Sequence, residues 1–110
     1  MPRNREIATI CFMKIEPGEV VIAVLHSPRE KLIGILDEIT AAGVTMRAVD
    51  LGYFDDWCRS IAEGDPALGM SDYFFPMWRI ERITRDEGTA DIPSMSDQFL
   101  TRTGKKMSEQ

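Results

Sequence analysis

The sequence predicts a mainly β domain of the α+β class with one short helix, and three observations support this prediction. Residues 20–26 (VVIAVLH) form a near-continuous apolar run after the turn sequence EPGE at 16–19, as expected for a strand covered on both faces. Residues 72–87 (DYFFPMWRIERITRDE) are rich in aromatic and β-branched residues and are broken at Pro76, which indicates two short strands. Apolar residues recur at helical spacing within residues 52–64.

Length, composition and charge exclude several classes of protein. The chain has 110 residues, enough for one domain with a single core, and its 44% hydrophobic and 28% charged content is typical of globular proteins. A formal net charge of −5 gives no general attraction to phosphate backbones, so a nucleic-acid partner is not expected. The sequence has no run of 18 apolar residues and begins without the apolar region of a secretory signal, so no membrane is expected. Cys11 and Cys58 form no CxxC pair, and we expect a cytoplasmic protein with reduced thiols.

The domain is expected to span residues 1–88, followed by a C-terminal extension over 89–110. After Gly88 the composition becomes polar, and SMSDQFLTRTG predicts a short helix that docks through Phe99 and Leu100. The final residues, GKKMSEQ, are typical of a frayed end.

The N-terminal segment has two interpretations. Residues 6–15 (EIATICFMKI) are β-branched and apolar, which predicts a strand. Translation could instead begin at Met13, because the well-patterned domain starts near Lys14, and residues 1–12 would then be an artefact or an accessory strand. Residues 1–13 are in either case outside the well-patterned part of the domain.

The segment 52–64 has the pattern of a short amphipathic helix. Two acidic residues in its first turn, Asp55 and Asp56, favour the positive end of the helix dipole, and Gly64 ends the helix. The apolar residues occupy positions i, i+3, i+4 and i+7 on one face: Phe54, Trp57, Cys58 and Ile61.

The segment 27–49 (SPREKLIGILDEITAAGVTMRAV) supports two different folds. As a helix it would begin with the N-cap Ser27 and a capping box completed by Glu30, and would end at Gly43. As two strands it would turn at HSPRE and again at AAG, and Gly34 would then serve a strand that bends sharply. The local pattern alone favours the helix, despite the cost of about 1 kcal/mol for a glycine in its middle.

A resemblance to a known family supports the interpretation of residues 27–49 as two strands. The segments KLIGILDEITAAGVTMRAVDL and YFFPMWRIERI are similar to the small Sm-like, SH3-type β-barrels. In that family a strand with a glycine near its start turns into another strand, and a late strand breaks once and returns as I-x-x-I. Here Gly34, 43–49, 75–76 and 80–83 take those places. The resemblance implies a five-stranded barrel with the short helix between strands three and four.

Two further relations bear on fold and function. The chain is also similar to a family of small bacterial proteins of uncharacterised function that share PREK, then GV and an arginine, then FDDW and FFP. This resemblance covers nearly the whole chain and implies no activity. The alternative fold is a ferredoxin-like α+β sandwich, which requires a helix over residues 28–42.

The sequence contains no recognisable catalytic, cofactor or metal motif. His26 is the single histidine and ends an apolar run, as a turn or capping residue does. Asp50, Asp55 and Asp56 are explained as strand-end and helix-start residues, and no nucleophile–base motif, Walker loop or GxGxxG occurs. We therefore expect no enzyme activity, no cofactor and no metal site.

Several aromatic and basic residues are candidate contacts for a partner. Aromatic side chains can stack on bases or bury themselves in a protein interface, although core packing is the commoner role in an acidic protein. Arg79, Arg82 and Arg85 recur every third residue, which divides them between the two faces of a strand. The candidates are Trp57, Trp78, Arg79, Arg82, Phe12 and Phe99, with Tyr73, Phe74 and Phe75 as further aromatic residues.

The functional expectation is a non-catalytic small-barrel module that works through an unidentified protein partner or through self-assembly. The apolar pieces EIATICFM and DQFL indicate docking segments, and a homo-oligomer, most simply a dimer, is expected. The alternatives are a ligand-binding regulatory domain of ferredoxin-like type and an Sm-like RNA-binding protein.

Overall fold

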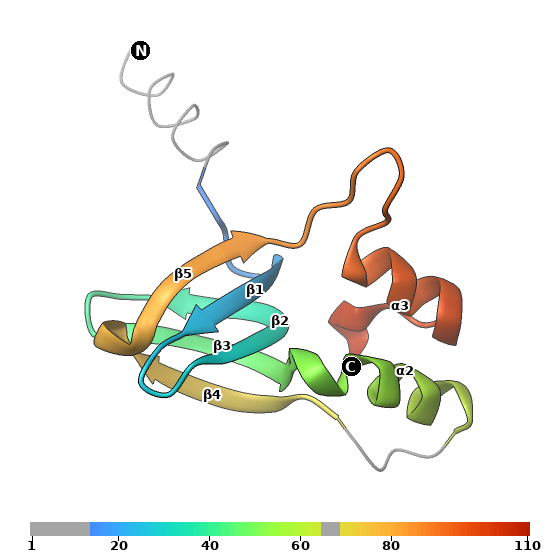
Figure 1. Ribbon diagram of the computed structural model, residues 1–110, viewed down its shortest axis with the longest axis horizontal. Helices are drawn as coiled ribbons and strands as arrows, with labels where there is room; N and C mark the ends of the chain where they lie inside the picture. The colour runs from blue at the N-terminus through green and yellow to red at the C-terminus, as the bar shows by residue number, and fades with distance from the viewer. Residues whose placement is uncertain (1–13, 65–68) are drawn as a thin grey trace.

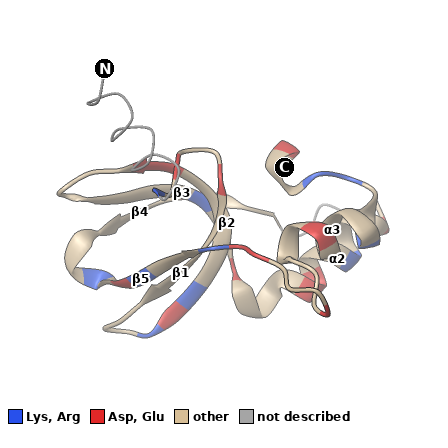
Figure 2. Ribbon diagram, turned by 90° about the horizontal axis from the view of Figure 1, so that it is seen from above, with Lys and Arg blue, Asp and Glu red and all other residues tan. Residues whose placement is uncertain are grey.

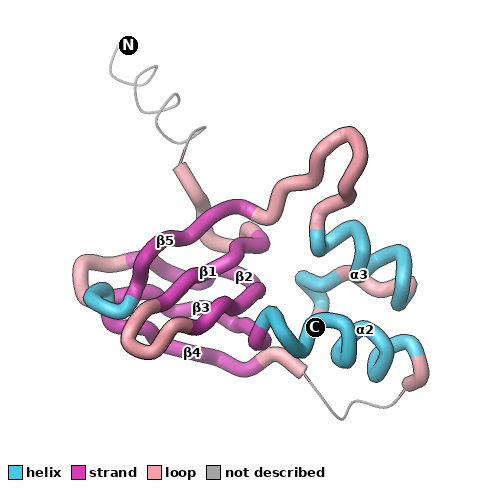
Figure 3. Tube along the Cα trace, in the orientation of Figure 1, coloured by secondary structure: helices cyan, strands magenta, loops and turns pink. Residues whose placement is uncertain are grey.

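The computed structural model describes residues 14–64 and 69–110, so most of the predicted N-terminal strand and Phe12 lie outside the described residues. Five strands and two α-helices account for most of the described chain (Figures 1 and 3). In chain order the elements are β1 (Val20–Leu25), β2 (Glu30–Ile39), β3 (Gly43–Asp50), η1 (Leu51–Tyr53), α2 (Phe54–Ala62), β4 (Ser71–Pro76), η2 (Met77–Arg79), β5 (Ile80–Arg85), α3 (Met95–Thr103) and η3 (Met107–Glu109). The short η elements are single 3-10 turns.

The five strands form one antiparallel sheet in the order β4-β3-β2-β1-β5. The helix interpretation of residues 28–42 is therefore wrong, and with it the ferredoxin-like alternative, because this stretch contains β2. The capping residue Ser27 instead lies in the β1–β2 turn with φ 57°, and the Ser27–Pro28 peptide is cis. The mainly β class and the helix between the third and fourth strands are confirmed.

The sheet must be strongly curled, since its two edge strands are joined by a short link in the chain. β4 and β5 lie at opposite edges, yet only η2 joins them. A flat five-stranded sheet would separate its edges by roughly 19 Å, whereas the link from Pro76 to Ile80 reaches at most roughly 14 Å. Seen from above, β3 and β4 face β1 and β5, and β2 runs along the bend (Figure 2). The sheet is nevertheless open, since no pairing joins β4 to β5 among the strands described, and the predicted barrel closure is not observed.

Gly34 lies within β2 at a point where the backbone of β3 approaches closely. It pairs with Val21 of β1 and Ala48 of β3. A Cβ at this position would overlap the carbonyl oxygen of Arg47 and lie 2.6 Å from the Cα of Ala48. Extra residues at Asp37 in β2 and at Glu81 in β5 form bulges, which increase the local twist and bend of the strands. The expected need for a residue without a side chain at position 34 is confirmed, whereas closure of a barrel is not.

The curled sheet separates two apolar clusters, one on each face. The alternation along β2 divides its side chains: Leu32 and Leu36 face one cluster, and Ile33 faces the other. We call the cluster enclosed by the sheet the inner core; its buried members are Val21, Ala23, Leu25, Leu32, Leu36, Val44, Met46, Ala48 and Phe75. The outer core lies between the sheet and the helices; its buried members are Ile33, Val49, Phe54, Trp57, Cys58, Met70, Phe99 and Met107.

The C-terminal extension is part of the fold. Ser94 caps α3 through its hydroxyl, which accepts from the amide of Asp97, and the carboxylate of Asp86 accepts from the amides of Met95 and Ser96 at 2.8 Å. Phe99 is fully buried and docks α3 as expected.

Two details of the expected extension are wrong. Leu100 is exposed, because it lies one position beyond the face of α3 that Phe99 buries. The end of the chain does not fray, because Met107 in η3 is buried in the outer core.

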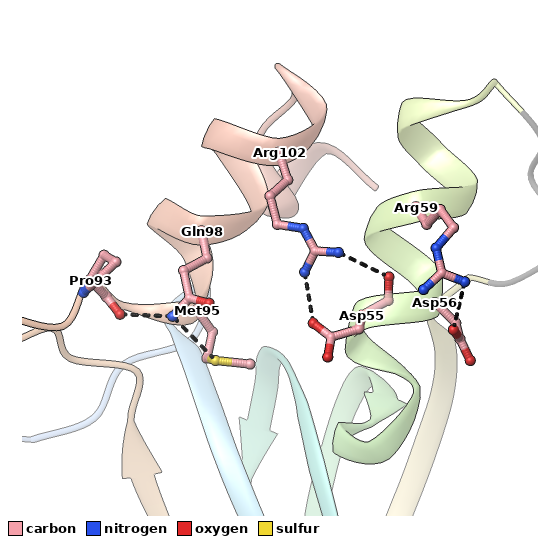
Figure 4. Close-up of polar contacts among 7 residues, drawn as sticks. All are labelled: Asp55, Asp56, Arg59, Pro93, Met95, Gln98 and Arg102. Carbon is pink, nitrogen blue, oxygen red and sulfur yellow. Dashed lines mark hydrogen bonds and ion pairs between the residues drawn. The ribbon is translucent and has the colours of Figure 1, made fainter.

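An ion pair joins the two helices. Arg102 of α3 donates to a carboxylate oxygen of Asp55 in α2 at 2.7 Å and to the Asp55 carbonyl at 3.3 Å (Figure 4). The hydrogen bond to Asp55 raises the pKa of Arg102. Asp55 was expected to serve the dipole of α2, and the structure adds this second role.

Candidate interaction surface

Three of the four exposed aromatic side chains among the described residues lie at β4 and at the turn that follows it; the fourth is Tyr53 in η1. Trp78 is 64% exposed and Phe74 is 56% exposed. We use the term β4–η2 surface for Tyr73, Phe74, Met77 and Trp78, which are all exposed. In Figure 1, the link between β4 and β5 lies at the end of the sheet opposite α2 and α3. Tyr73 and Phe74 point to opposite faces of β4, so these residues flank the edge strand on both faces. Exposed apolar groups that lie together mark an interaction surface more often than scattered ones do.

Phe74 is exposed because the alternation along β4 points it away from the inner core. Phe75 packs inside the sheet, and Tyr73 stacks on it with ring centroids 5.3 Å apart. Phe74 lies on the opposite face, over Gly43, where a Cβ would come within 2.8 Å of the tip of the Phe74 ring. The missing side chain at position 43 therefore leaves room for a ring that no other described element covers.

Among residues 14–64 and 69–110, the backbone of β4 is paired along one side only. That partner is β3, and on the same side the amide of Met77 donates to the carbonyl of Ala42 at 2.9 Å. Because backbone groups alternate in direction along a strand, those of Asp72 and Phe74 point away from β3. Pro76 follows the same alternation, and its lack of an N–H suits an outward position.

The other edge of the sheet is better protected. Within the described residues β5 pairs only with β1, and it carries Glu81, Arg82 and Arg85 within six residues. The register shift between Val24 and Leu25 leaves Glu81 as an extra residue, so β5 contains a bulge near its start. Charged side chains and bulges are the usual means of protecting an edge strand from another chain. β4 has only Asp72 near its start and Pro76 at its end as protecting residues, and its pairing with β3 contains no bulge.

Arg79 stabilises the turn beside this surface rather than offering a free cation. Its side chain is only 18% exposed, and it donates to the carbonyl of Pro28 at 2.8 Å and to the carboxylate of Glu30 at 2.9 Å. It also donates to the carbonyl of His26 at 3.3 Å. Trp78 meets the His26 ring edge-on, with centroids 6.3 Å apart. The β1–β2 turn and η2 thus hold each other in place.

Removing the hydrogen bonds between Arg79 and the β1–β2 turn should destabilise the protein measurably. Arg79→Ala is expected to lower the free energy of unfolding by about 1–2 kcal/mol, because it leaves two carbonyls and one carboxylate of the β1–β2 turn without their donor. Arg82→Ala is the matched control, since Arg82 is exposed on β5 and has no hydrogen bond or ion pair among residues 14–64 and 69–110; its effect should stay within about 0.5 kcal/mol. Urea unfolding followed by circular dichroism measures the stability of both variants, and equal losses would contradict a stabilising role for Arg79.

The structure separates the other predicted contact residues. Trp57 and Phe99 are wrong as candidates for a free contact, because both are fully buried in the outer core with ring centroids 4.5 Å apart. Phe75 is buried in the inner core, and Phe12 lies outside the described residues. Trp78 is highly exposed, and the further aromatic candidates Phe74 and Tyr73 are exposed as well.

The arginines on β5 and η2 form no common basic stripe. Arg79 binds the β1–β2 turn, whereas Arg85 donates to the carboxylate of Glu19 at 2.7 Å and to the carbonyl of Lys14. The hydrogen bond from Arg85, followed by a backbone hydrogen bond at Glu16, lowers the pKa of Glu19. Basic and acidic residues are interspersed along the sheet (Figure 2), as the spacing of the arginines predicted.

Hollows in the surface carry no cluster of reactive groups. A hollow of about 610 Å³ lies over β2 and β3, and its charged residues include Arg47, which pairs with Asp72 at 3.4 Å. A second, of about 470 Å³, lies between β2 and residues 14–17 and contains apolar Ile15, Leu36 and Ile39. Within the described ranges, no group of three or more His, Cys, Asp or Glu side chains is placed to hold a metal ion.

His26 and Cys58 have ordinary surroundings. His26 is exposed at the β1–β2 turn, and its Nδ1 lies 3.1 Å from the hydroxyl of Ser27. Burial raises the pKa of the Cys58 thiol, which opposes formation of a reactive thiolate. The described part of the chain also has no helix of the length and apolar character needed to cross a bilayer.

Met77 is the member of the β4–η2 surface that the sequence reasoning missed. The sequence signal for Met77 was its position directly after Pro76, where the strand breaks and side chains stop alternating between the two faces of β4.

Comparison of the chain with protein-family models, curated proteins and solved structures gave no significant match.

Proposed function

We propose that this protein is a non-catalytic module of the small-barrel type that works through protein–protein contacts. The observation that carries the proposal is the β4–η2 surface, where an unprotected edge strand and exposed aromatic side chains occur together. Aromatic residues and methionine are enriched in the cores of protein interfaces. An edge strand adds backbone hydrogen bonds that any extended segment can satisfy.

The strand order and the link between the edges support the Sm-like, SH3-type assignment. An antiparallel sheet in the order β4-β3-β2-β1-β5, bent at Gly34 and joined across its edges by one 3-10 turn, has the geometry expected of such a barrel. We assign the module to the cytoplasm, because two cysteines without a CxxC pair suit a reducing compartment.

Binding through proteins fits the chemistry of the surface better than catalysis or nucleic-acid binding does. The β4–η2 surface contains aromatic and thioether side chains, and the nearest arginine, Arg79, already binds the β1–β2 turn. Nucleic-acid sites require cations free to contact phosphates, and the chain has a net charge of −5. A protein partner needs neither a cation cluster nor an activated nucleophile.

Site-specific photo-crosslinking in living cells tests the proposal. A photoreactive phenylalanine analogue placed at position 78 should crosslink to one defined protein, because the Trp78 side chain lies in the contact. The same analogue at Ile92 is the control, since Ile92 is equally exposed but lies in the loop between β5 and α3. No defined product at position 78, or the same products at both positions, would contradict the proposal.

A further inference from the structure

We propose that the partner of the β4–η2 surface is a second copy of this chain, bound through antiparallel pairing of β4 with β4 about a two-fold axis. This inference rests on the proposed function, because it uses the same surface. The two free edges of the sheet differ in chemistry, and that difference selects one pairing from those that geometry allows.

The outward backbone groups of β4 are self-complementary. Asp72 and Phe74 both direct their N–H and C=O groups away from β3, as the alternation fixed by Met77 requires. A two-fold axis at Tyr73 places Asp72 of one copy opposite Phe74 of the other. In each pair, the N–H of Asp72 donates to the C=O of Phe74 in the other copy, and the N–H of Phe74 donates to the C=O of Asp72. Neither pair requires an N–H from Pro76.

The charge of Asp72 does not oppose this arrangement. Arg47 on β3 of the same copy binds its carboxylate at 3.4 Å, so the charge enters the contact already paired. An unpaired carboxylate would instead be costly when an interface removes it from water. The ring of Phe74 then packs beside the Asp72–Arg47 pair of the second copy, and Tyr73 meets Tyr73 on the other face.

Head-to-tail pairing of β4 with β5 is the geometric rival, and the charges on β5 disfavour it. Glu81 is paired with Arg29 at 3.8 Å, but the Arg82 side chain has no ion pair within residues 14–64 and 69–110, and Tyr73 and Phe74 on β4 offer it no partner. Repetition of that contact would also build rings or filaments, whereas pairing of β4 with itself closes at a dimer.

The residues after β4 enlarge the contact beyond two short strands. Stable interfaces usually bury about 1,200–2,000 Å² in total, which six-residue strands alone do not supply. With the axis at Tyr73, Met77 at the start of η2 lies opposite Gly69, directly before β4 of the other copy. Met77, exposed in one copy, can then be covered by the second.

Sedimentation equilibrium of the full chain tests this pairing with three proteins. The wild type should form a species of twice the 12.5 kDa chain mass. Phe74→Pro should weaken dimerisation roughly 100-fold, because it removes an outward N–H and a ring from each copy without removing a β3–β4 hydrogen bond. Arg82→Glu on β5 is the matched control and should leave the dimer intact.

Circular dichroism confirms that each variant is folded, and Phe74→Lys serves if the proline variant is not. Lysine keeps the N–H but places a charge on the edge, and it should also weaken the dimer. A monomeric wild type at all concentrations, or a Phe74→Lys protein that dimerises as the wild type does, would overturn the inference. So would dissociation caused by Arg82→Glu, which would indicate pairing between β4 and β5.

The crosslinking experiment separates failure of this inference from failure of the proposed function. A product at position 78 of twice the chain mass supports both. A product with one different protein, and no self-crosslink, overturns the second-copy inference and leaves the proposed function standing. Absence of any defined product contradicts both.

Discussion

Replacing Gly34 by alanine is expected to lower the free energy of unfolding by about 3 kcal/mol or more, which is a large part of the stability of a small domain. The added methyl group would overlap the carbonyl oxygen of Arg47 and approach the Cα of Ala48 to 2.6 Å. Both obstacles are backbone atoms of β3, so no side-chain rotation can relieve the contact. β2 and β3 would have to separate at the bend, which breaks the pairing on which both cores depend.

Gly69→Ala is the matched control for this prediction. Gly69 has no heavy atom within 4 Å of the Cβ position, and its φ lies outside the left-handed region. The substitution should therefore be neutral or stabilise the protein by up to about 1 kcal/mol. Urea unfolding monitored by circular dichroism compares the two variants. A Gly34→Ala protein within about 1 kcal/mol of the wild type would show that the sheet does not need a glycine there.

Phe99→Ala should have a comparable effect and should release the C-terminal extension from the sheet. Phe99 is fully buried, and its ring lies 4.5 Å from that of Trp57 and 6.5 Å from that of Phe54. Truncation of a buried phenylalanine costs about 3–5 kcal/mol. Since α3 buries only this one residue fully, we expect the helix to undock before the sheet unfolds.

Trp57 fluorescence reports the undocking if Trp78 is first replaced by phenylalanine. The emission of Trp57 should shift to the red at urea concentrations that leave the β-sheet circular dichroism unchanged. Leu100→Ala is the control on the same helix, because Leu100 is exposed and its removal uncovers nothing. An unchanged Trp57 emission in folded Phe99→Ala protein would contradict the prediction.

The sequence predicted β1, β3, β4, β5 and α2 because their signals are local. The apolar face of α2 and the break after β4 follow from residues within a few positions of each other. The segment 28–42 shows the limit of local signals. Its capping box has the residues typical of a helix start. The segment forms β2 instead because it pairs with β1 and β3 and buries apolar side chains in both the inner and the outer core.

The candidate surface could be predicted only in part, because exposure depends on tertiary packing. Trp57 and Trp78 are the same type of residue. In the structure Trp57 is buried beside α3, whereas Trp78 is exposed. Phe74 and Phe75 are adjacent, and only the direction of the sheet's curvature decides which of them is enclosed. The roles of Arg79 and Met107 were missed for the same reason, since their partners lie far away in the sequence or on another element.

The position of β5 has a consequence for the order in which the fold forms. β1, β2 and β3 follow one another with short turns, whereas β1 meets β5 across roughly sixty intervening residues. Closing so long a loop costs more chain entropy than forming either hairpin. We expect the three-stranded meander to assemble early and β5 to dock late, which leaves the apolar edge of β1 briefly open to other chains on the ribosome or at high concentration.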